Sequence, residues 1–194
     1  SNLNLLPLAV SRIASYCRSL SEISSVFNLH VRWPRHSVEE TIADLNRPVV
    51  VGLSCYVWNT QASLAIARAI RRHHPDCLIV LGGASVPKRD NRIRAFLDKN
   101  PSVDILVRGD GEISFANILR SVIAGEGLGG VNGIAFRHAN RMGAIAINPP
   151  EEWNKNLDLI PSPFLNGIFD ELLDRYPGKA TGVVLESNRG CPYS

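Results

Sequence analysis

The sequence lacks most of the motifs that identify an enzyme or a binding protein directly. It has no Walker phosphate-binding motif, no H-x-x-H or H-E-x-x-H pattern among its five histidines, and no nucleic-acid motif. No apolar run approaches the roughly 20 residues that span a bilayer. The apolar stretch 3–10 has neither a basic flank nor a cleavage site, so it is not a signal peptide. We therefore expect neither a nucleic acid nor a membrane as a partner.

Cysteine is scarce and widely spaced. The four cysteines are Cys17, Cys55, Cys77 and Cys191, and no two of them have the spacing of a metal site. A free thiol in an apolar segment behaves as a small hydrophobic side chain. This cysteine usage favours a reducing, cytoplasmic setting.

Three apolar runs organise the chain, at residues 49–59, 77–85 and 104–112. Each is apolar at nearly every position before it ends in small and polar residues, which is typical of a strand covered on both faces. Between the first two runs, residues 59–75 place alanine and isoleucine on one helical face. The order strand, helix, strand predicts a βαβ unit with a right-handed crossover. In an open parallel sheet of this kind, ligands bind beyond the carboxyl ends of the strands.

The flanking segments predict further elements around this sheet. Ser37 and Glu40 form a capping-box pattern at the start of one helix. The other expected elements are helices at 6–20, 91–100, 114–124 and 167–176, a half-buried strand at 27–33, a β-hairpin with strands 133–137 and 144–148, a proline-rich linker at 149–166, and a last strand before a Gly-Cys-Pro turn. We therefore predict a flavodoxin-like (Rossmann-type) α/β fold, with a mostly parallel sheet and a C-terminal β-hairpin.

The two ends of the sequence predict a fragment of a longer polypeptide. The opening strand of a doubly wound domain usually lies in the middle of the sheet, and here it is missing or very short. The chain also stops immediately after a new strand and turn.

Residues 125–130 read GEGLGG and match the dinucleotide pattern G-x-G-x-x-G. They follow a predicted helix and lead into a predicted strand, which is the reverse of the order that the fingerprint requires. We interpret this segment as a helix terminator and loop.

The candidate binding residues lie at the predicted carboxyl ends of the three strands. Ser54 can bind a ligand through its hydroxyl or satisfy a nearby backbone group, and the neighbouring Tyr56 and Trp58 can line an apolar pocket or pack internally. The pair Gly82-Gly83 lets a backbone approach a ligand or simply makes a tight turn.

Two carboxylates follow the third strand. Asp110 and Glu112 lie at its predicted end. Glu112 can instead stabilise the first turn of the next helix, because a carboxylate favours the positive end of the helix dipole. No Ser/His/Asp catalytic set can be assigned from the sequence.

Seven short segments, taken in order, carry a family resemblance. They are Pro7-Leu8 leading into 13–16 (IASY), 51–54 (VGLS), 80–83 (VLGG), 107–112 (VRGDGE), 133–137 (GIAFR), 157–164 (LDLIPSPF) and 186–194 (ESNRGCPYS). Together they resemble the N-terminal part of cobalamin-dependent radical S-adenosylmethionine (SAM) enzymes, over nearly the whole chain. The sequence departs from the family at Ala9, where glycine is usual, and at Asp110, where glutamate is usual.

The resemblance implies cobalamin as the cofactor and a methyltransferase as the full-length enzyme. It also implies that Cys191 is the first of three cysteines holding a [4Fe–4S] cluster, for which thiolates are the usual ligands. The sequence ends before the other two, so the cluster and S-adenosylmethionine belong to the full-length parent. The motif D-x-H-x-x-G is absent, and we expect no histidine beneath the cobalt.

The resemblance also assigns candidate contacts. The nucleotide tail of cobalamin is expected beside Ser54 and the backbone of Gly82 and Gly83. Four further residues are expected along the corrin edge: Tyr56, Val57, Ser85 and Asp110.

The resulting domain assignment has three parts. Residues 1–148 form a cobalamin-binding α/β domain, 149–177 a linker with a short helix, and 178–194 the first strand of a truncated radical SAM barrel, which is the expected partner within the same polypeptide. Two alternatives stay open: a structural or partner-docking domain without a cofactor, and a flavodoxin-like module that binds a flavin or a nucleotide.

Overall fold

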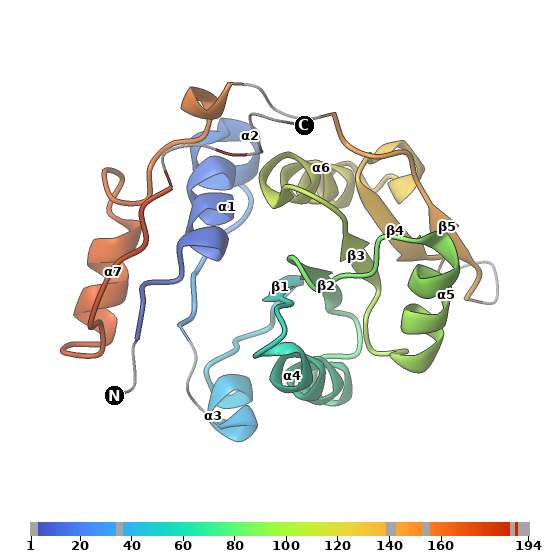
Figure 1. The fold of residues 1–194 in the computed structure, drawn as a ribbon, viewed down its shortest axis with the longest axis horizontal. Helices are drawn as coiled ribbons and strands as arrows, with labels where there is room; N and C mark the ends of the chain where they lie inside the picture. Colours follow the sequence, from blue (N-terminus) through green and yellow to red (C-terminus); the bar gives the residue numbers. More distant parts are fainter. Residues whose placement is uncertain (1–3, 34–36, 139–142, 153–155, 187–188, 190–194) are drawn as a thin grey trace. The chain divides into compact units, whose positions relative to one another are not determined.

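The computed structural model describes residues 4–33, 37–138, 143–152, 156–186 and 189. They fall into two compact units (Figure 1). The sheet unit is the continuous segment Pro34–Trp153, and the helical unit combines Ser1–Trp33 with Asn154–Ser194. Within the described ranges, no helix is both long enough and apolar enough to cross a membrane.

The sheet unit contains a five-stranded sheet whose spatial order follows the sequence, β1-β2-β3-β4-β5. The strands are β1 (Val50–Ser54), β2 (Leu78–Gly82), β3 (Ile105–Val107), β4 (Ile134–Arg137) and β5 (Ile145–Ile147). The first three are parallel, whereas β4 is antiparallel to β3 and β5 is antiparallel to β4. The α/β class is confirmed, and the sheet is mixed: it is parallel over its first three strands and antiparallel beyond them.

The antiparallel half follows from the path of residues 125–133. Helix α6 (Gly111–Ala124) runs back from the end of β3 and stops at Gly125, whose left-handed φ of 64° suits a helix terminator. The next residues, including the short 3₁₀ helix η1 (Leu128–Gly130), return the chain so that Ile134 pairs with Val107. β4 therefore enters the sheet from the edge where β3 ends, and this fixes its direction.

Helices cover both faces of the sheet. One face packs on α3 (Val38–Ala43), α4 (Thr60–His73) and α5 (Asp90–Lys99), and the other packs on α6 (Figure 1). The capping box at the start of α3 is confirmed, since Ser37 accepts from the Glu40 amide at 3.1 Å and Glu40 accepts from the Ser37 amide at 2.8 Å. This double coverage explains why the three core strands are apolar on both sides.

The predicted strand at 27–33 is wrong: in the described part of the chain these residues follow the short helix α2 (Ser21–Ser24) and form no strand. Val31 and Trp33 instead pack with residues of α1 (Leu8–Ser19) and α7 (Ile168–Arg175). Trp33 meets Tyr176 edge to face, with ring centroids 6.3 Å apart. The alternating pattern therefore marks an extended segment that lies on helices.

Residues from the two ends of the sequence pair within the helical unit. Leu5 and Gly182 form an isolated parallel bridge, and the Thr181 amide donates to the Asn4 carbonyl at 2.9 Å. The 3₁₀ helix η2 (Leu157–Leu159) falls in the segment 149–166 that the sequence predicts as a linker, and it belongs to the helical unit. Among the residues described, the stretch after residue 178 has only this bridge as sheet pairing, so the barrel strand stays a prediction.

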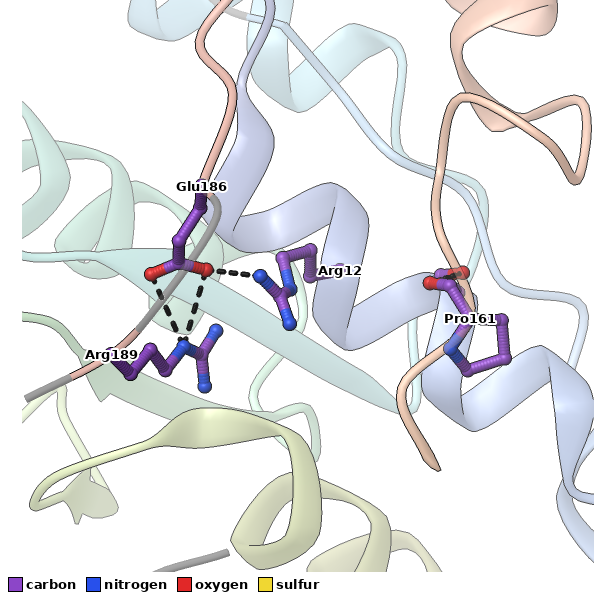
Figure 2. Close-up of polar contacts among 5 residues, drawn as sticks. Arg12, Pro161, Glu186 and Arg189 are labelled. Atoms are coloured by element: carbon purple, nitrogen blue, oxygen red, sulfur yellow. Dashed lines mark hydrogen bonds and ion pairs between the residues drawn. The ribbon is translucent and has the colours of Figure 1, made fainter. Parts of the chain in front are cut away.

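Helix α1 bonds to residues far along the sequence in the same unit. Its polar contacts include Arg12 with Glu186 (Figure 2), Ser15 with the Pro161 carbonyl at 2.6 Å, and Arg18 with both carboxylate oxygens of Glu171 at 2.7 and 2.8 Å. The sequence separations are 174, 146 and 153 residues. These contacts join the two sequence segments of the helical unit.

Cys77, immediately before β2, is 2% exposed, and this burial raises the pKa of its thiol from 9.0 to about 11. Between about pH 9 and pH 11 the folded chain therefore keeps a thiol proton that the unfolded chain loses. The contribution of this thiol to the free energy of unfolding is fully present below pH 9 and is lost as the pH rises to about 11. We expect a loss of up to roughly 2–3 kcal/mol from this group across that window. Chemical unfolding at pH 8, 9.5 and 10.5 measures the loss.

The control for this alkaline effect is Cys77→Ala, which removes the thiol and leaves the other alkaline groups in place. The unfolding free energy of the variant should fall less steeply above pH 9 than that of the parent. Equal slopes for the two chains would contradict the assignment to Cys77.

Candidate functional site

The carboxyl edge of the three parallel strands brings the predicted binding segments together. The strand register pairs Ser54 with Gly82 and Gly82 with Val107, so the ends of β1, β2 and β3 lie side by side. The loops that follow them begin at Cys55, Gly83 and Arg108. The sequence correctly placed these segments at one edge of the sheet, where an open α/β sheet binds its ligands.

Ser54 is held within the turn that leads into α4. Its hydroxyl oxygen accepts from the Asn59 amide nitrogen at 2.8 Å, and its carbonyl accepts from the Ser63 hydroxyl at 2.7 Å. A serine hydroxyl that accepts one hydrogen bond can still donate its own hydrogen. The sequence left open whether Ser54 binds a ligand or bonds to nearby groups of the chain. The two roles are compatible, because Ser54 orders the turn and its hydroxyl can still donate a hydrogen bond.

The two glycines at the end of β2 differ in what surrounds them. The Cys55 amide donates to the Gly82 carbonyl at 2.6 Å, and the Ser85 amide donates to the Cys55 carbonyl at 3.0 Å. Between them Gly83 has a φ of +129°, and a Cβ there would lie 2.6 Å from the Cys55 carbonyl oxygen. Gly83 therefore permits the close approach of two loops.

Gly82 is open by comparison. The only heavy atom within 4 Å of a Cβ built there is the Cβ of Val107, at 3.4 Å. Gly109, in the loop after β3, has a φ of +93° and nothing within 4 Å of its own Cβ position. The backbone is thus accessible at the ends of both β2 and β3.

An exposed apolar surface follows β1. The rings of Tyr56 and Trp58 stack with centroids 4.9 Å apart and an interplanar angle of 2°. Val57 and Trp58 are 88% and 81% exposed. The turn that carries them is fixed, because the Tyr56 amide donates to Asn59 and the Thr60 hydroxyl donates to the Tyr56 carbonyl at 2.6 Å.

Sequence reasoning named Trp58 as a residue that can line a pocket but did not select it as a cofactor contact, and it did not consider Asn59. Asn59 immediately precedes α4, and its side chain bonds back to both Ser54 and the Tyr56 amide. A polar residue directly before a predicted helix is the signal that could have identified this organising role.

The remaining predicted contacts lie on the other two loops. Ser85 is half-buried beside Cys55, and Asp110 is exposed at the residue before α6. Glu112, in the first turn of α6, is only 4% exposed. Its position favours the structural role at the helix start, where a carboxylate meets the positive end of the dipole.

The charges at this edge are of both signs. Lys88 and Arg89 are exposed in the loop before α5, and Asp110 is exposed before α6. The described histidines of the sheet unit lie at the opposite edge: His73 ends α4, His74 follows it, and His138 follows β4.

No group of three or more metal-binding side chains is present in the described ranges. Cys191, the predicted cluster ligand, lies outside those ranges. The carboxyl edge of β1–β3 presents polar and apolar side chains from three loops.

The family model "B12 binding domain" matches residues 2–119, more than half of the chain. One relative is a 2-(S-pantetheinyl)-carbapenam-3-carboxylate methyltransferase from Streptantibioticus cattleyicolor, 32% identical over 97% of this chain and 28% of its own length. Another is the cobalamin-dependent radical SAM methyltransferase TokK from Streptomyces tokunonensis, 30% identical over the same shares. The chain thus spans little more than a quarter of these relatives.

Solved structures share the fold. The cobalamin-dependent S-adenosylmethionine radical enzyme OxsB, with aqua-cobalamin and S-adenosylmethionine bound, superposes with a TM-score of 0.72 at 21% identity, over 99% of this chain and 25% of that one. The radical S-adenosylmethionine methyltransferase TsrM from Kitasatospora setae gives a TM-score of 0.56 at 16% identity, over 81% and 28% of the two chains.

Proposed function

The chain belongs to the B12-binding domain family, and from this membership we propose that it binds cobalamin at the carboxyl edge of β1–β3, as the N-terminal part of a radical SAM methyltransferase. One observation supports the location: the strand register pairs Ser54 with Gly82 at the aligned carboxyl ends of β1 and β2.

The residues at this edge fit cobalamin. A corrin is large, flat and largely apolar, and it carries amides around its rim. Val57 and Trp58 present an apolar surface of the kind that such a ring requires. The amides need polar partners at the border of that surface, and the exposed Asp110 carboxylate and the Ser85 hydroxyl can serve there.

The glycines give the tail of the cofactor a path. A Cβ at Gly82 would lie 3.4 Å from the Cβ of Val107, and a larger side chain would fill space at the end of β2 that glycine leaves open. Ser54, already oriented by Asn59, can donate its hydrogen to an acceptor in the tail. Gly83 contributes by holding the β1 and β2 loops together, and Tyr56 by stacking on Trp58.

When bound, cobalamin supplies a cobalt centre that can carry a methyl group. The chain's own part is to bind and orient the cofactor and to keep water from the covered face. The described histidines of the sheet unit lie at the far edge.

We extend the proposal to the rest of the polypeptide. Residues 1–148 form the cobalamin domain, 149–177 the linker, and 178–194 the beginning of a barrel in which Cys191 and two later cysteines hold a [4Fe–4S] cluster with S-adenosylmethionine. The relatives' printed names and the position of Cys191 in the sequence support this extension. Methyl transfer is then a reaction of the whole protein.

A binding experiment tests the location. The chain is mixed with hydroxocobalamin and desalted, and the visible spectrum of the protein fraction is recorded. We expect the parent to retain a corrin band. Gly82→Val should lose it, because the valine side chain fills the space beside the backbone that the cofactor tail needs. The loss should be at least about tenfold in retained cofactor, equal to roughly 1.4 kcal/mol or more of binding free energy.

Gly82→Ala is the matched control, because its Cβ makes only an ordinary contact with Val107. It should retain most of the cofactor, and both variants should unfold at nearly the parent's temperature. A parent that retains no corrin band would refute cobalamin binding by this chain. Full retention by Gly82→Val would refute the location, and retention of a flavin or nucleotide in place of cobalamin would favour the flavodoxin-like alternative.

A further inference from the structure

Asn59 is the residue immediately before α4, yet its side chain does not bond to the helix. An asparagine at this N-cap position usually accepts a hydrogen bond from the amide of the second or third helical residue. None of the residues of α4, all of which the structure describes, donates to the Asn59 side chain. The side chain bonds instead to the preceding turn, where it lies 2.8 Å from the Ser54 hydroxyl and 2.7 Å from the Tyr56 amide. It is therefore committed to the end of β1.

The backbone fixes which way the side-chain amide of Asn59 faces. A backbone amide can only donate, so the Asn59 atom that meets the Tyr56 amide must be the acceptor, Oδ1. The other atom of the same planar group is Nδ2, which can only donate, and it faces the hydroxyl oxygen of Ser54. The Ser54 oxygen must therefore accept this hydrogen bond.

The Ser54 hydroxyl keeps its own hydrogen. That hydrogen cannot point at the donating group of Asn59, and none of the other residues that the structure describes accepts it. The carbonyl of Ser54 is held separately, because the hydroxyl of the buried Ser63 donates to it at 2.7 Å. Ser54 is thus fixed on two sides and presents one hydrogen-bond donor.

We infer that Asn59 is a positioning residue that sets the direction of hydrogen bonding at this edge: by donating to Ser54 it makes the serine a donor to the ligand. The identity of the ligand rests on the proposed function. The tail of cobalamin carries suitable acceptors in its phosphate oxygens and in the unprotonated nitrogen of its base. A ligand group that can only donate, such as an ammonium, would meet the Ser54 hydrogen and find no acceptor.

Asn59→Asp tests this inference because it reverses one hydrogen bond and keeps the shape of the side chain. One aspartate oxygen can accept from the Tyr56 amide, as Asn59 does, but the other cannot donate. Ser54 must then turn its hydrogen toward position 59, and the donor for the ligand is lost. We expect the dissociation constant for hydroxocobalamin, measured by equilibrium dialysis with corrin absorbance as the readout, to rise about tenfold, the scale of one hydrogen bond to a charged acceptor.

Two controls separate the hydrogen bond from the added charge. Gln61→Glu adds the same charge at an exposed position in the first turn of α4, and it should bind hydroxocobalamin as the parent does. Ser54→Ala removes the hydroxyl, so adding Asn59→Asp to it should weaken binding no further. Cobinamide, which lacks the nucleotide tail, should bind equally to Asn59→Asp and to the parent.

Three binding results would overturn the positioning role. They are parent-like binding by Asn59→Asp, an equal loss in Gln61→Glu, and a further loss when Asn59→Asp is added to Ser54→Ala. An equal loss with cobinamide would overturn the assignment of the acceptor to the tail.

Urea unfolding of the same chains examines the hydrogen bonds without the cofactor. Asn59→Asp should unfold near the parent's midpoint, because it keeps a bond to both partners. Asn59→Ala should unfold at a lower midpoint, because it loses both. A parent that binds no hydroxocobalamin refutes the proposed function and with it the ligand, whereas an Asn59→Asp midpoint as low as that of Asn59→Ala overturns the assigned hydrogen bonds themselves.

Discussion

Replacing Gly83 by alanine is expected to destabilise the fold by roughly 3–5 kcal/mol and to abolish cobalamin retention. Two costs combine: a φ of +129° is unfavourable for any residue with a Cβ, and that Cβ would lie 2.6 Å from the Cys55 carbonyl oxygen. Strained backbone costs of order 1–3 kcal/mol, and overpacking adds about as much again. Because the clash is with backbone, the β1 and β2 loops must separate, and the accessible edge that they form is lost with them.

Gly109→Ala separates the two costs. Gly109 also has a positive φ, of +93°, but its Cβ position is empty to 4 Å. Its alanine variant should therefore suffer only the backbone strain, which lowers its free energy of unfolding by about 1–2 kcal/mol. Urea unfolding of both variants measures the difference. If Gly83→Ala were no less stable than Gly109→Ala, the close contact with Cys55 would not be what requires glycine at position 83.

Leu106→Ala is expected to lower the free energy of unfolding by about 3 kcal/mol and the melting temperature by roughly 6–12 °C. Leu106 is completely buried in β3, which pairs with β2 on one side and β4 on the other. The cavity would open where the parallel and antiparallel halves of the sheet meet, and neither neighbouring strand can move into it without breaking its own pairing. Thermal unfolding followed by circular dichroism provides the measurement.

Val57→Ala is the control for this core substitution. It also shortens an aliphatic side chain, but Val57 is 88% exposed and should change stability by less than about 0.5 kcal/mol. On the proposed function it should weaken cobalamin retention while Leu106→Ala, once folded at low temperature, retains it. Equal stability losses in the two variants would show that β3 is not the packed centre of this sheet.

The sequence is informative where structure depends on neighbouring residues. Apolar runs predicted β1 and β2 and placed Ser54 beside Gly82, because parallel strands joined by one helix share an edge. The capping box at Ser37 and Glu40 was visible for the same reason, since both of its hydrogen bonds lie within one helical turn. The sequence shows where the turn glycines are, but it does not show whether each one faces a ligand or another loop.

What the sequence did not reveal depends on distant partners. The alternation at 27–33 is the same for a strand and for an extended segment lying on helices, and only the packing of Val31 and Trp33 distinguishes the two. The direction of β4 depends on how residues 125–133 return along the sheet. Arg12 resembles any helix-surface arginine until Glu186, 174 residues away, is brought beside it.

The division of the chain into a continuous unit and a discontinuous one has a consequence for the order of events on the ribosome. The sheet unit, Pro34–Trp153, contains all five strands and can complete its pairing as soon as it has emerged. Helix α1 is synthesised before the sheet, yet its partners Pro161, Glu171 and Glu186 arrive only after the whole sheet has been made. Closing so long a loop is slow for a free chain. A sheet that has already folded shortens the flexible chain between α1 and these partners. Helix α1 is therefore made before the sheet but reaches its final contacts after the sheet has folded.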